Sequence, residues 1–146
     1  EEANAYIDIY FNKFRNVKRF IDDIIDQAKK QGYVETILGR RRYVPELESK
    51  NRNIQKFGER IAINSPIQGS GADIIKVSMV NVYRKLKGKK SRIVLQIHDE
   101  LLVEVFEEEK NDILEMIKRE MENSIKLDVP VKVEVGTGKT WLECKK

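Results

Sequence analysis

The sequence has 146 residues, of which 36% are charged and 40% hydrophobic, and its formal net charge is +4. This length allows one domain with its own core, and no apolar run is long enough to span a membrane. The single cysteine, Cys144, excludes an internal disulfide and favours a reducing compartment. No signal peptide is evident, and the chain opens at Glu1 inside a helical pattern, so we expect part of a longer protein.

Positive charge is unevenly distributed along the chain. Residues 1–92 contain 20 Lys and Arg against 11 Asp and Glu, whereas residues 93–146 contain 8 against 13. A basic part followed by an acidic part suits a protein that grips a polyanion with the first and acts on it with the second. A solvated surface can show the same imbalance, so the asymmetry alone does not distinguish these possibilities.

Residues 1–31 have the apolar periodicity of two helices, with a break near Asn16. Gly32 follows in the position where glycine commonly ends a helix. The aromatic residues of this segment are expected to pack rather than to stack on bases.

Residues 33–47 have the pattern of two short strands joined through Gly39, and they contain three consecutive arginines: Arg40, Arg41 and Arg42. Guanidinium groups bind phosphates through paired hydrogen bonds. A targeting-like or merely solvated basic run has the same composition, so the residues alone leave phosphate binding open.

Residues 51–87 form the longest helical pattern, on which polar residues recur at every fourth position: Arg60, Asn64 and Gln68. This spacing places the three side chains on one face of a helix. Pro66 interrupts the pattern, because Ser65-Pro66-Ile67-Gln68 has the features of a new helix start with Ser65 as N-cap. We therefore expect a kinked helix, in which Gln68 is either a capping residue or part of a polar face.

Residues 93–105 predict a β-hairpin, because apolar and β-branched residues alternate on both sides of a short acidic break. The break is His98-Asp99-Glu100, without the glycine that two-residue turns favour. Acidic turn residues are often simply solvated. However, the flanking strands are apolar on nearly both faces, so we expect the tip to emerge from a core. The only histidine of the chain adjoins the aspartate, and such a hairpin is a rigid mount for metal or phosphate chemistry.

Residues 107–126 predict an amphipathic helix whose buried stripe comprises Ile113, Met116, Ile117, Met121 and Ile125. Residues 129–135 alternate like a strand that would add to the sheet of the hairpin. Together the elements predict an α+β fold with helices packed on a small antiparallel sheet that carries the hairpin.

Residues 136–140, Gly-Thr-Gly-Lys-Thr, look like the end of a phosphate-binding loop. We reject that interpretation, because Val133 stands where the loop needs a glycine and too few residues remain for the helix that must follow. Trp141 is expected to anchor the tail against the core.

At three places the chain resembles the carboxy-terminal part of the family A, or polymerase I-type, DNA polymerases. Gln-Ile-His-Asp-Glu-Leu-Leu-Val-Glu, residues 96–104, is similar to the catalytic motif on a palm hairpin. Thr-x-x-Gly-Arg-Arg-Arg-x-x-Pro, residues 36–45, and Glu-Arg-x-Ala-x-Asn-x-Pro-x-Gln-Gly, residues 59–69, are similar to segments that lie near or hold DNA. The resemblance covers nearly all 146 residues and departs mildly from the pattern at Ser70-Gly71.

The resemblance implies two-metal nucleotidyl transfer, with two Mg²⁺ ions roughly 4 Å apart, adding deoxynucleotides to a primer 3′ end in DNA replication or repair. Asp99 is then a catalytic metal ligand, Glu100 a secondary and mostly electrostatic catalytic contributor, and His98 the residue that positions the primer terminus. The DNA-binding residues are then Arg40, Arg41, Arg42, Arg60, Asn64 and Gln68. The last three of these would contact the minor groove, whose acceptors occur in every correct base pair.

The resemblance also assigns residues 1–50 to the end of the fingers and residues 51–146 to the second half of the palm. The second ligand aspartate and the helix that binds the incoming nucleotide do not occur in this sequence. The chain is therefore expected to need the upstream part of the polymerase as a partner, together with primer-template DNA and deoxynucleoside triphosphates. No membrane partner is expected, and the implied location is cytoplasmic, at the nucleoid.

Other classes of protein remain open. A phage-type single-subunit RNA polymerase shares a His-Asp hairpin, although the residue after the aspartate is typically not glutamate. A non-catalytic DNA-binding module with a purely structural hairpin is also possible. A metal phosphohydrolase needs several histidines, and this chain has one.

Overall fold

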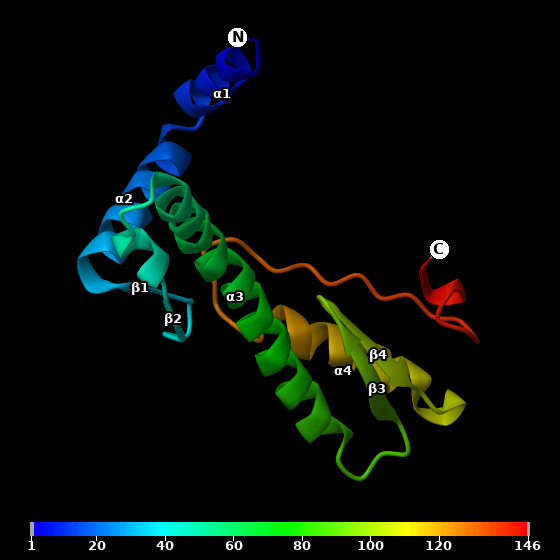
Figure 1. The fold of residues 1–146 in the computed structure, drawn as a ribbon. Coiled ribbons are helices and arrows are strands. Elements are labelled where there is room, and N and C mark those ends of the chain that lie inside the picture. Colours follow the sequence, from blue (N-terminus) through cyan, green and yellow to red (C-terminus); the bar gives the residue numbers. More distant parts are fainter. Residues whose placement is uncertain (1, 146) are drawn as a thin grey trace. The chain divides into compact units, whose positions relative to one another are not determined.

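The computed structural model describes residues 2–145, which form four α-helices, three short 3-10 helices and two antiparallel strand pairs (Figure 1). The predicted α+β class is confirmed, with two small sheets in place of one. The chain divides into two compact units, the first ending at Ser70 and the second beginning at Gly71. The assignment of residues 1–50 to the fingers and 51–146 to the palm stays a prediction.

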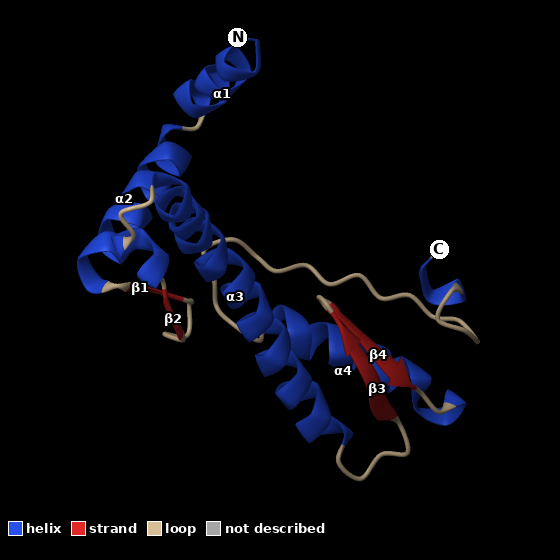
Figure 2. Ribbon diagram, in the orientation of Figure 1, coloured by secondary structure: helices blue, strands red, loops and turns tan. Residues whose placement is uncertain are grey.

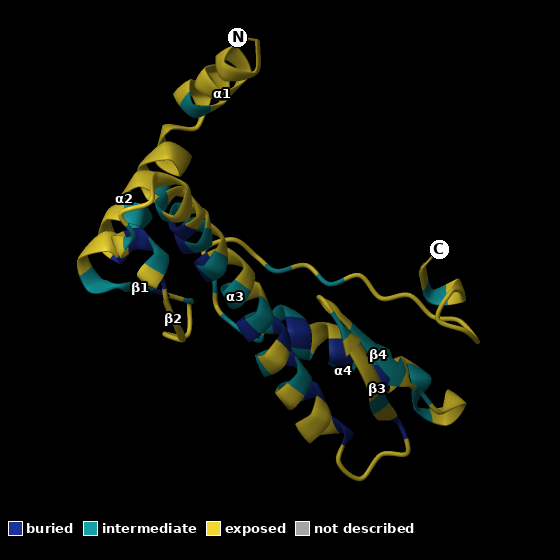
Figure 3. Ribbon diagram, viewed as in Figure 1, coloured by how far each residue is buried: buried dark blue, intermediate teal, exposed yellow. Residues whose placement is uncertain are grey.

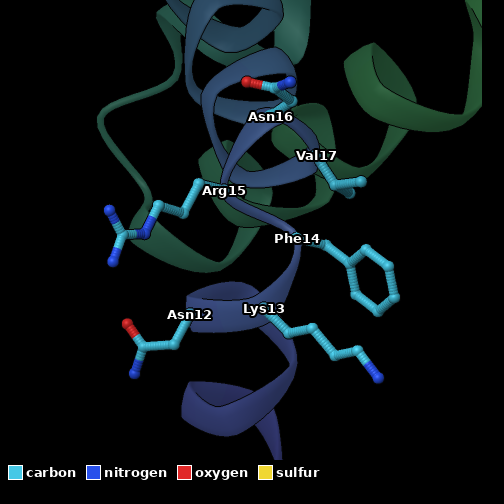
Figure 4. Close-up of a pocket in the computed structure, with 6 residues that line it drawn as sticks. All are labelled: Asn12, Lys13, Phe14, Arg15, Asn16 and Val17. Atoms are coloured by element: carbon cyan, nitrogen blue, oxygen red, sulfur yellow. The ribbon is translucent and has the colours of Figure 1, made fainter.

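The first unit opens with two helices, α1 (Glu2–Lys13) and α2 (Arg15–Gln31). They are separated at Phe14, whose φ of −112° and ψ of 60° are not helical. The predicted break near Asn16 thus falls two residues earlier. Figure 4 shows residues 12–17 around the break; because the residues that line this hollow are consecutive, it is a consequence of the break itself.

A strand pair follows these helices. Gly32 ends α2 as predicted, with a φ of 79° and its N–H donated to the carbonyl oxygen of Ala28 at 2.8 Å. A side chain would strain this left-handed backbone. The antiparallel strands β1 (Tyr33–Glu35) and β2 (Arg41–Tyr43) confirm the predicted pair joined through Gly39.

The helix α3 (Arg52–Leu86) runs through 35 residues and contains Pro66 in its interior. The predicted new helix start at Ser65 is therefore wrong, because an N-cap needs non-helical backbone. Pro66 has no N–H to donate to the carbonyl of Ala62, but both residues are buried, and Ala62 belongs to the core of the first unit. The burial of Ala62 and Pro66 favours the continuous helix; a bend at Pro66 within it stays a prediction.

The core of the second unit joins the later part of α3 to the helix α4 (Lys110–Glu122). Its buried members are Ile75, Val82, Leu86, Ile113, Ile117 and Met121. Hairpin side chains, among them Leu101 and Val103, pack against this cluster. The buried stretches of both helices are dark blue in Figure 3. Helix-on-hairpin packing therefore supports the predicted hairpin. No helix among residues 2–145 has the length and apolar character needed to cross a membrane.

The helix α4 is shorter than the predicted helix 107–126. A 3-10 turn, η2 (Glu107–Glu109), precedes it. At its end, Asn123 donates its side-chain Nδ2–H to the carbonyl oxygen of Arg119 at 2.8 Å, a bond that competes with helix continuation. The predicted buried stripe is confirmed for Ile113, Ile117 and Met121, while Met116 is half-buried and packs against them. The prediction is wrong for Ile125, which lies beyond the helix.

The predicted strand at residues 129–135 is wrong. That segment pairs with no strand among residues 2–145 and is drawn as a loop in Figure 2. Val133 nevertheless packs against the core, and its N–H donates to the Glu122 carboxylate at 3.1 Å. Alternation places apolar side chains on one side of the chain but specifies no backbone partner, and Pro130 has no N–H to offer one.

The strands β3 (Arg92–Ile97) and β4 (Glu100–Glu104) confirm the predicted hairpin. At its base the buried Ser91 donates its Oγ–H to the Glu109 carboxylate at 2.7 Å and accepts the Phe106 N–H at 3.1 Å. The Glu109 carboxylate also accepts the Ser91 N–H at 3.1 Å. These bonds, above all that from the Ser91 hydroxyl, hold the pKa of Glu109 below its usual value. The start of β3 is thereby tied to the chain that follows β4.

Replacing Glu109 with Gln is expected to lower the urea midpoint of unfolding at pH 7 and to have a smaller effect at pH 3. A carboxyl whose pKa falls on folding stabilises the folded state above its ordinary pKa of 4.5, and this contribution is lost as pH falls through the folded value. Urea titrations at both pH values measure the difference. Glu108→Gln is the control, because Glu108 is exposed; an equal effect of Glu109→Gln at both pH values would contradict the role of its charge.

Candidate functional site

The tip of the hairpin is a two-residue turn, His98-Asp99, enclosed by the facing residues Ile97 and Glu100. His98 has a φ of 51°, the one positive φ of a non-glycine residue within residues 2–145. Histidine adopts this conformation more readily than branched residues do, so the turn forms without glycine. Gln96 stabilises it by donating its Nε2–H to the His98 carbonyl oxygen at 2.6 Å.

The two carboxylates at the tip have different surroundings. The predicted three-residue tip is corrected, because Glu100 belongs to β4 and Asp99 is the acidic residue of the turn. Asp99 is exposed, and its carboxylate has no hydrogen bond or ion pair with the residues described. Glu100 forms an ion pair with Lys145, with 3.4 Å between Oε2 and Nζ. Asp99 is therefore the carboxylate that is open to a cation.

The chemistry of this tip fits a divalent cation but does not complete a site for one. Carboxylate oxygens are the ligands that Mg²⁺ prefers. Among residues 2–145, no group of three His, Cys, Asp or Glu side chains lies close enough to hold a metal ion. A cation at Asp99 would need further oxygen ligands, as Mg²⁺ commonly takes from substrate phosphates.

Strand β3 contains a bulge at Val94. The register changes between Ile93, which faces Val103, and Leu95, which faces Leu102, so that Val94 has no partner. A bulge shifts the alternation of the strand beyond it, and Val94 and Leu95 are 55% and 44% exposed. The expectation that both faces of the strand lie in a core is therefore wrong for the chain as described.

The first two of the consecutive arginines have partners within the first unit. Arg40 donates an Nη2–H to the carbonyl oxygen of Gly69 at 3.0 Å. Arg41 donates from Nε to the Glu35 carboxylate at 2.8 Å and lies over the Tyr33 ring, 4.5 Å from its centroid. The hydrogen bond to Glu35 is the main reason that the pKa of Arg41 is raised. Both side chains therefore have structural contacts that the sequence pattern did not predict.

Arg42 lies on the other face of the strand pair. It faces Val34 across the sheet, whereas Arg41 faces Glu35, and neighbours along a strand point to opposite faces. Arg42 is exposed, and its guanidinium has no hydrogen bond or ion pair with the residues described. Of the three arginines, it is the one most available for a phosphate.

The loop between β1 and β2 lies against α3. The Ile37 N–H donates to Ser70 Oγ at 2.9 Å. A Cβ added to Gly69 would lie 2.6 Å from Thr36 Cγ2, so this approach requires glycine. The structure thus brings the arginine segment beside the part of α3 that follows directly after Gln68.

The predicted polar face of α3 is present in the structure. Arg60, Asn64 and Gln68 follow one another at a spacing of four within the continuous helix, and all three are exposed. The Arg60 guanidinium carbon lies 5.8 Å from the centroid of the Phe57 ring, within reach of a cation–π contact. Such a row of amide and guanidinium groups can donate hydrogen bonds to groove acceptors.

Nothing in the sequence pattern predicted a partner for Glu100. Lys145 lies far from it in sequence, in the 3-10 turn η3 (Glu143–Lys145), and a lysine in a tail follows no periodicity that would reveal its partner. The aromatic Trp141, expected to anchor the tail, is 41% exposed and lies 4.8 Å, centroid to Nζ, from Lys145.

Comparison with known proteins assigns these features to one class. The family model described as DNA polymerase family A matches residues 1–143. DNA polymerase I of Caldicellulosiruptor bescii is 48% identical over 99% of this chain and 17% of its own length, and that of Mycobacterium leprae is 50% identical over 97% and 16%. The POL domain of Pol1 from M. smegmatis, in complex with DNA primer-template and dNTP, superposes with a TM-score of 0.98 at 49% identity, covering 100% of this chain and 26% of that one.

The chain belongs to DNA polymerase family A. It spans about a sixth of the length of the curated relatives. Since the matches are DNA polymerases, neither a phage-type RNA polymerase nor a non-catalytic DNA-binding module is supported. Family A DNA polymerases are generally metal-dependent.

Arg42 and Arg41 should differ in their effect on DNA binding by the full-length polymerase. If Arg42 contacts a phosphate, Arg42→Gln should reduce the slope of log affinity against log salt by about 0.9, the value for one released counterion on duplex DNA. Arg41→Gln should leave the slope unchanged, because Glu35 already pairs with that charge. Fluorescence anisotropy with two duplexes of unrelated sequence measures both slopes; equal changes for the two variants, or strong sequence preference, would contradict this assignment.

Proposed function

We propose that this chain supplies one catalytic carboxylate and part of the DNA-binding surface of a template-directed DNA polymerase. The observation that carries the proposal is the exposed, unpaired Asp99 in a two-residue turn on a hairpin packed against a helical core. A carboxylate held this way is positioned by the fold rather than by a flexible loop, as a catalytic ligand must be. The match to DNA polymerase family A supports this role.

The proposed cofactor is Mg²⁺, with Asp99 as its ligand in this chain. An ion bound there would stabilise negative charge on the transferred phosphoryl group and would favour deprotonation of the attacking hydroxyl. Asp99 contributes one oxygen ligand, and the remaining ligands would come from the nucleotide and from an aspartate elsewhere in the polymerase. The donor type fits Mg²⁺, and the Asp99 carboxylate is exposed at the tip.

Two neighbours of Asp99 are assigned supporting roles. His98 is held in the turn by its positive φ and by the Gln96 bond to its carbonyl, which leaves the imidazole exposed. In that position it can contact the primer terminus. Glu100 points from the strand rather than the turn and pairs with Lys145, so its contribution is electrostatic.

The DNA-binding surface proposed in the first unit has two parts. Arg60, Asn64 and Gln68 would donate to minor-groove acceptors, which every correct base pair presents in similar positions. Arg42 would contact a backbone phosphate, while Arg40 bonds to α3 and Arg41 bonds across the strand pair. Primer-template DNA and deoxynucleoside triphosphates are the proposed substrates.

Asp99→Asn is expected to reduce turnover of the full-length polymerase on the order of a thousandfold, because the loss of a metal ligand removes several kcal/mol of transition-state stabilisation. DNA affinity should change little, since an amide keeps the shape and removes a charge that repels phosphate. Single-turnover incorporation and DNA titration measure the two effects. Near-normal turnover would mean that the hairpin is structural.

Variants of the neighbours serve as matched controls for that experiment. Glu100→Gln should cost much less than Asp99→Asn, because Glu100 is the residue already held by an ion pair. His98→Ala should mainly weaken extension from mismatched or dilute primer ends. Equal losses of turnover from Asp99→Asn and Glu100→Gln would contradict the proposal that Asp99 is the metal ligand and Glu100 only an electrostatic contributor.

The 146-residue chain by itself is expected to show no polymerase activity, because Asp99 is the one metal-ligand carboxylate proposed in it and two-metal transfer needs at least two. Incubation with primer-template, all four deoxynucleotides and Mg²⁺ should give no extension beyond a sample without protein. Template-dependent extension by this chain would defeat the proposal that its ligand set is incomplete.

A further inference from the structure

The Gly-x-Gly segment rejected above as a phosphate loop has another structural role. A Cβ added to Gly136 would lie 2.0 Å from the Cys144 carbonyl oxygen, and one on Gly138 would lie 2.4 Å from Glu143 Cβ. Neither glycine has a positive φ, so the need for glycine is one of space rather than of backbone conformation. The two glycines allow the last turn of the described chain to fold back against them.

Hydrogen bonds close this fold. The Lys139 N–H donates to the Glu143 carboxylate at 2.9 Å, across the turn that the glycines face. The N–H groups of Glu143 and Cys144 both donate to the carbonyl oxygen of Thr140, at 3.1 and 3.3 Å. Residues 136–145 therefore form a closed tail, a name we use for this segment below.

The closed tail presents Lys145 to the catalytic hairpin. Its Nζ lies 3.4 Å from the Glu100 Oε2 and 4.8 Å from the centroid of the Trp141 ring. Trp141 and Lys145 also line, with Asp99 and Glu100, one groove of about 710 Å³ in the second unit. The ammonium group thus lies within reach of both the indole ring and the carboxylate.

We propose that Lys145 is a positioning residue that acts through Glu100. The ion pair holds the Glu100 carboxylate away from the turn and offsets its charge, so that Asp99 remains the carboxylate offered to a cation. This inference rests on the proposed function, because it assigns Lys145 a role at the same tip. Without Lys145, Glu100 is free to turn towards a cation at Asp99 and should bind it more tightly.

A double-mutant cycle in the full-length polymerase tests this inference. Lys145→Met keeps most of the side-chain length and removes the charge. It should lower the half-saturating Mg²⁺ concentration for single-turnover incorporation about two- to fivefold, the range that an exposed ion pair can reach. In the Glu100→Gln background the same Lys145 change should have no further effect, since the residue through which it acts is neutral.

A second readout does not depend on activity. Mn²⁺ binding to the polymerase–DNA complex, measured by electron paramagnetic resonance without nucleotide, should tighten with Lys145→Met and remain unchanged with Lys145→Arg. Lys139→Met is the matched control, because its side chain has no hydrogen bond or ion pair with the described residues. If Lys145→Met behaves like Lys139→Met, or if its effect persists in the Glu100→Gln background, the inference is overturned.

The tail's closure is tested separately with Gly136→Ala. The added methyl cannot coexist with the Cys144 carbonyl, so trypsin should cleave after Lys139 faster than in the wild type, as followed by mass spectrometry, and the Mg²⁺ dependence should match that of Lys145→Met. Unchanged cleavage would overturn the conclusion that the closed tail requires glycine at position 136. A wild-type polymerase without Mg²⁺-dependent extension would instead defeat the proposed function, so the two failures are distinguishable.

Discussion

The positive φ of His98 is the constraint on which the candidate site depends. It allows the strands to reverse within two residues, which places Asp99 in the turn and Glu100 at the start of β4. At the other end of the hairpin, the bonds between Ser91 and Glu109 tie its base, and the helical core supports one face. The tip is therefore held by packing and hydrogen bonds on a rigid element.

Glycines at three positions permit contacts that bring distant segments together. Gly69 lets the loop carrying the arginines lie against α3, where a methyl group would meet Thr36. Gly136 and Gly138 let the closed tail fold, which brings Lys145 to Glu100. In both places the lack of a side chain permits a close backbone approach, and that approach positions a charged residue of the candidate site. The placement of the charged residues of the candidate site therefore depends on glycines that carry no functional group themselves.

The sequence predicted those elements whose signals are local. The helix end at Gly32, the strand pair through Gly39 and the β3–β4 hairpin all depend on backbone preferences and on alternation within a few residues. Its errors arose where packing overrides such signals. Ser65 has a good capping sequence, yet burial around Pro66 favours a continuous helix. Residues 129–135 alternate like a strand, yet alternation does not specify a backbone partner.

The sequence by itself determined the chemical groups of the candidate site, because residue types at motif spacing carry that information: an aspartate beside a histidine on a hairpin, and a polar row on a helix. Only the tertiary structure decided which of those groups are free to act. It pairs Glu100 with Lys145 and Arg41 with Glu35, while Asp99 and Arg42 have no ion-pair partner in the described chain. These pairings depend on distances between segments far apart in sequence, which no local pattern records.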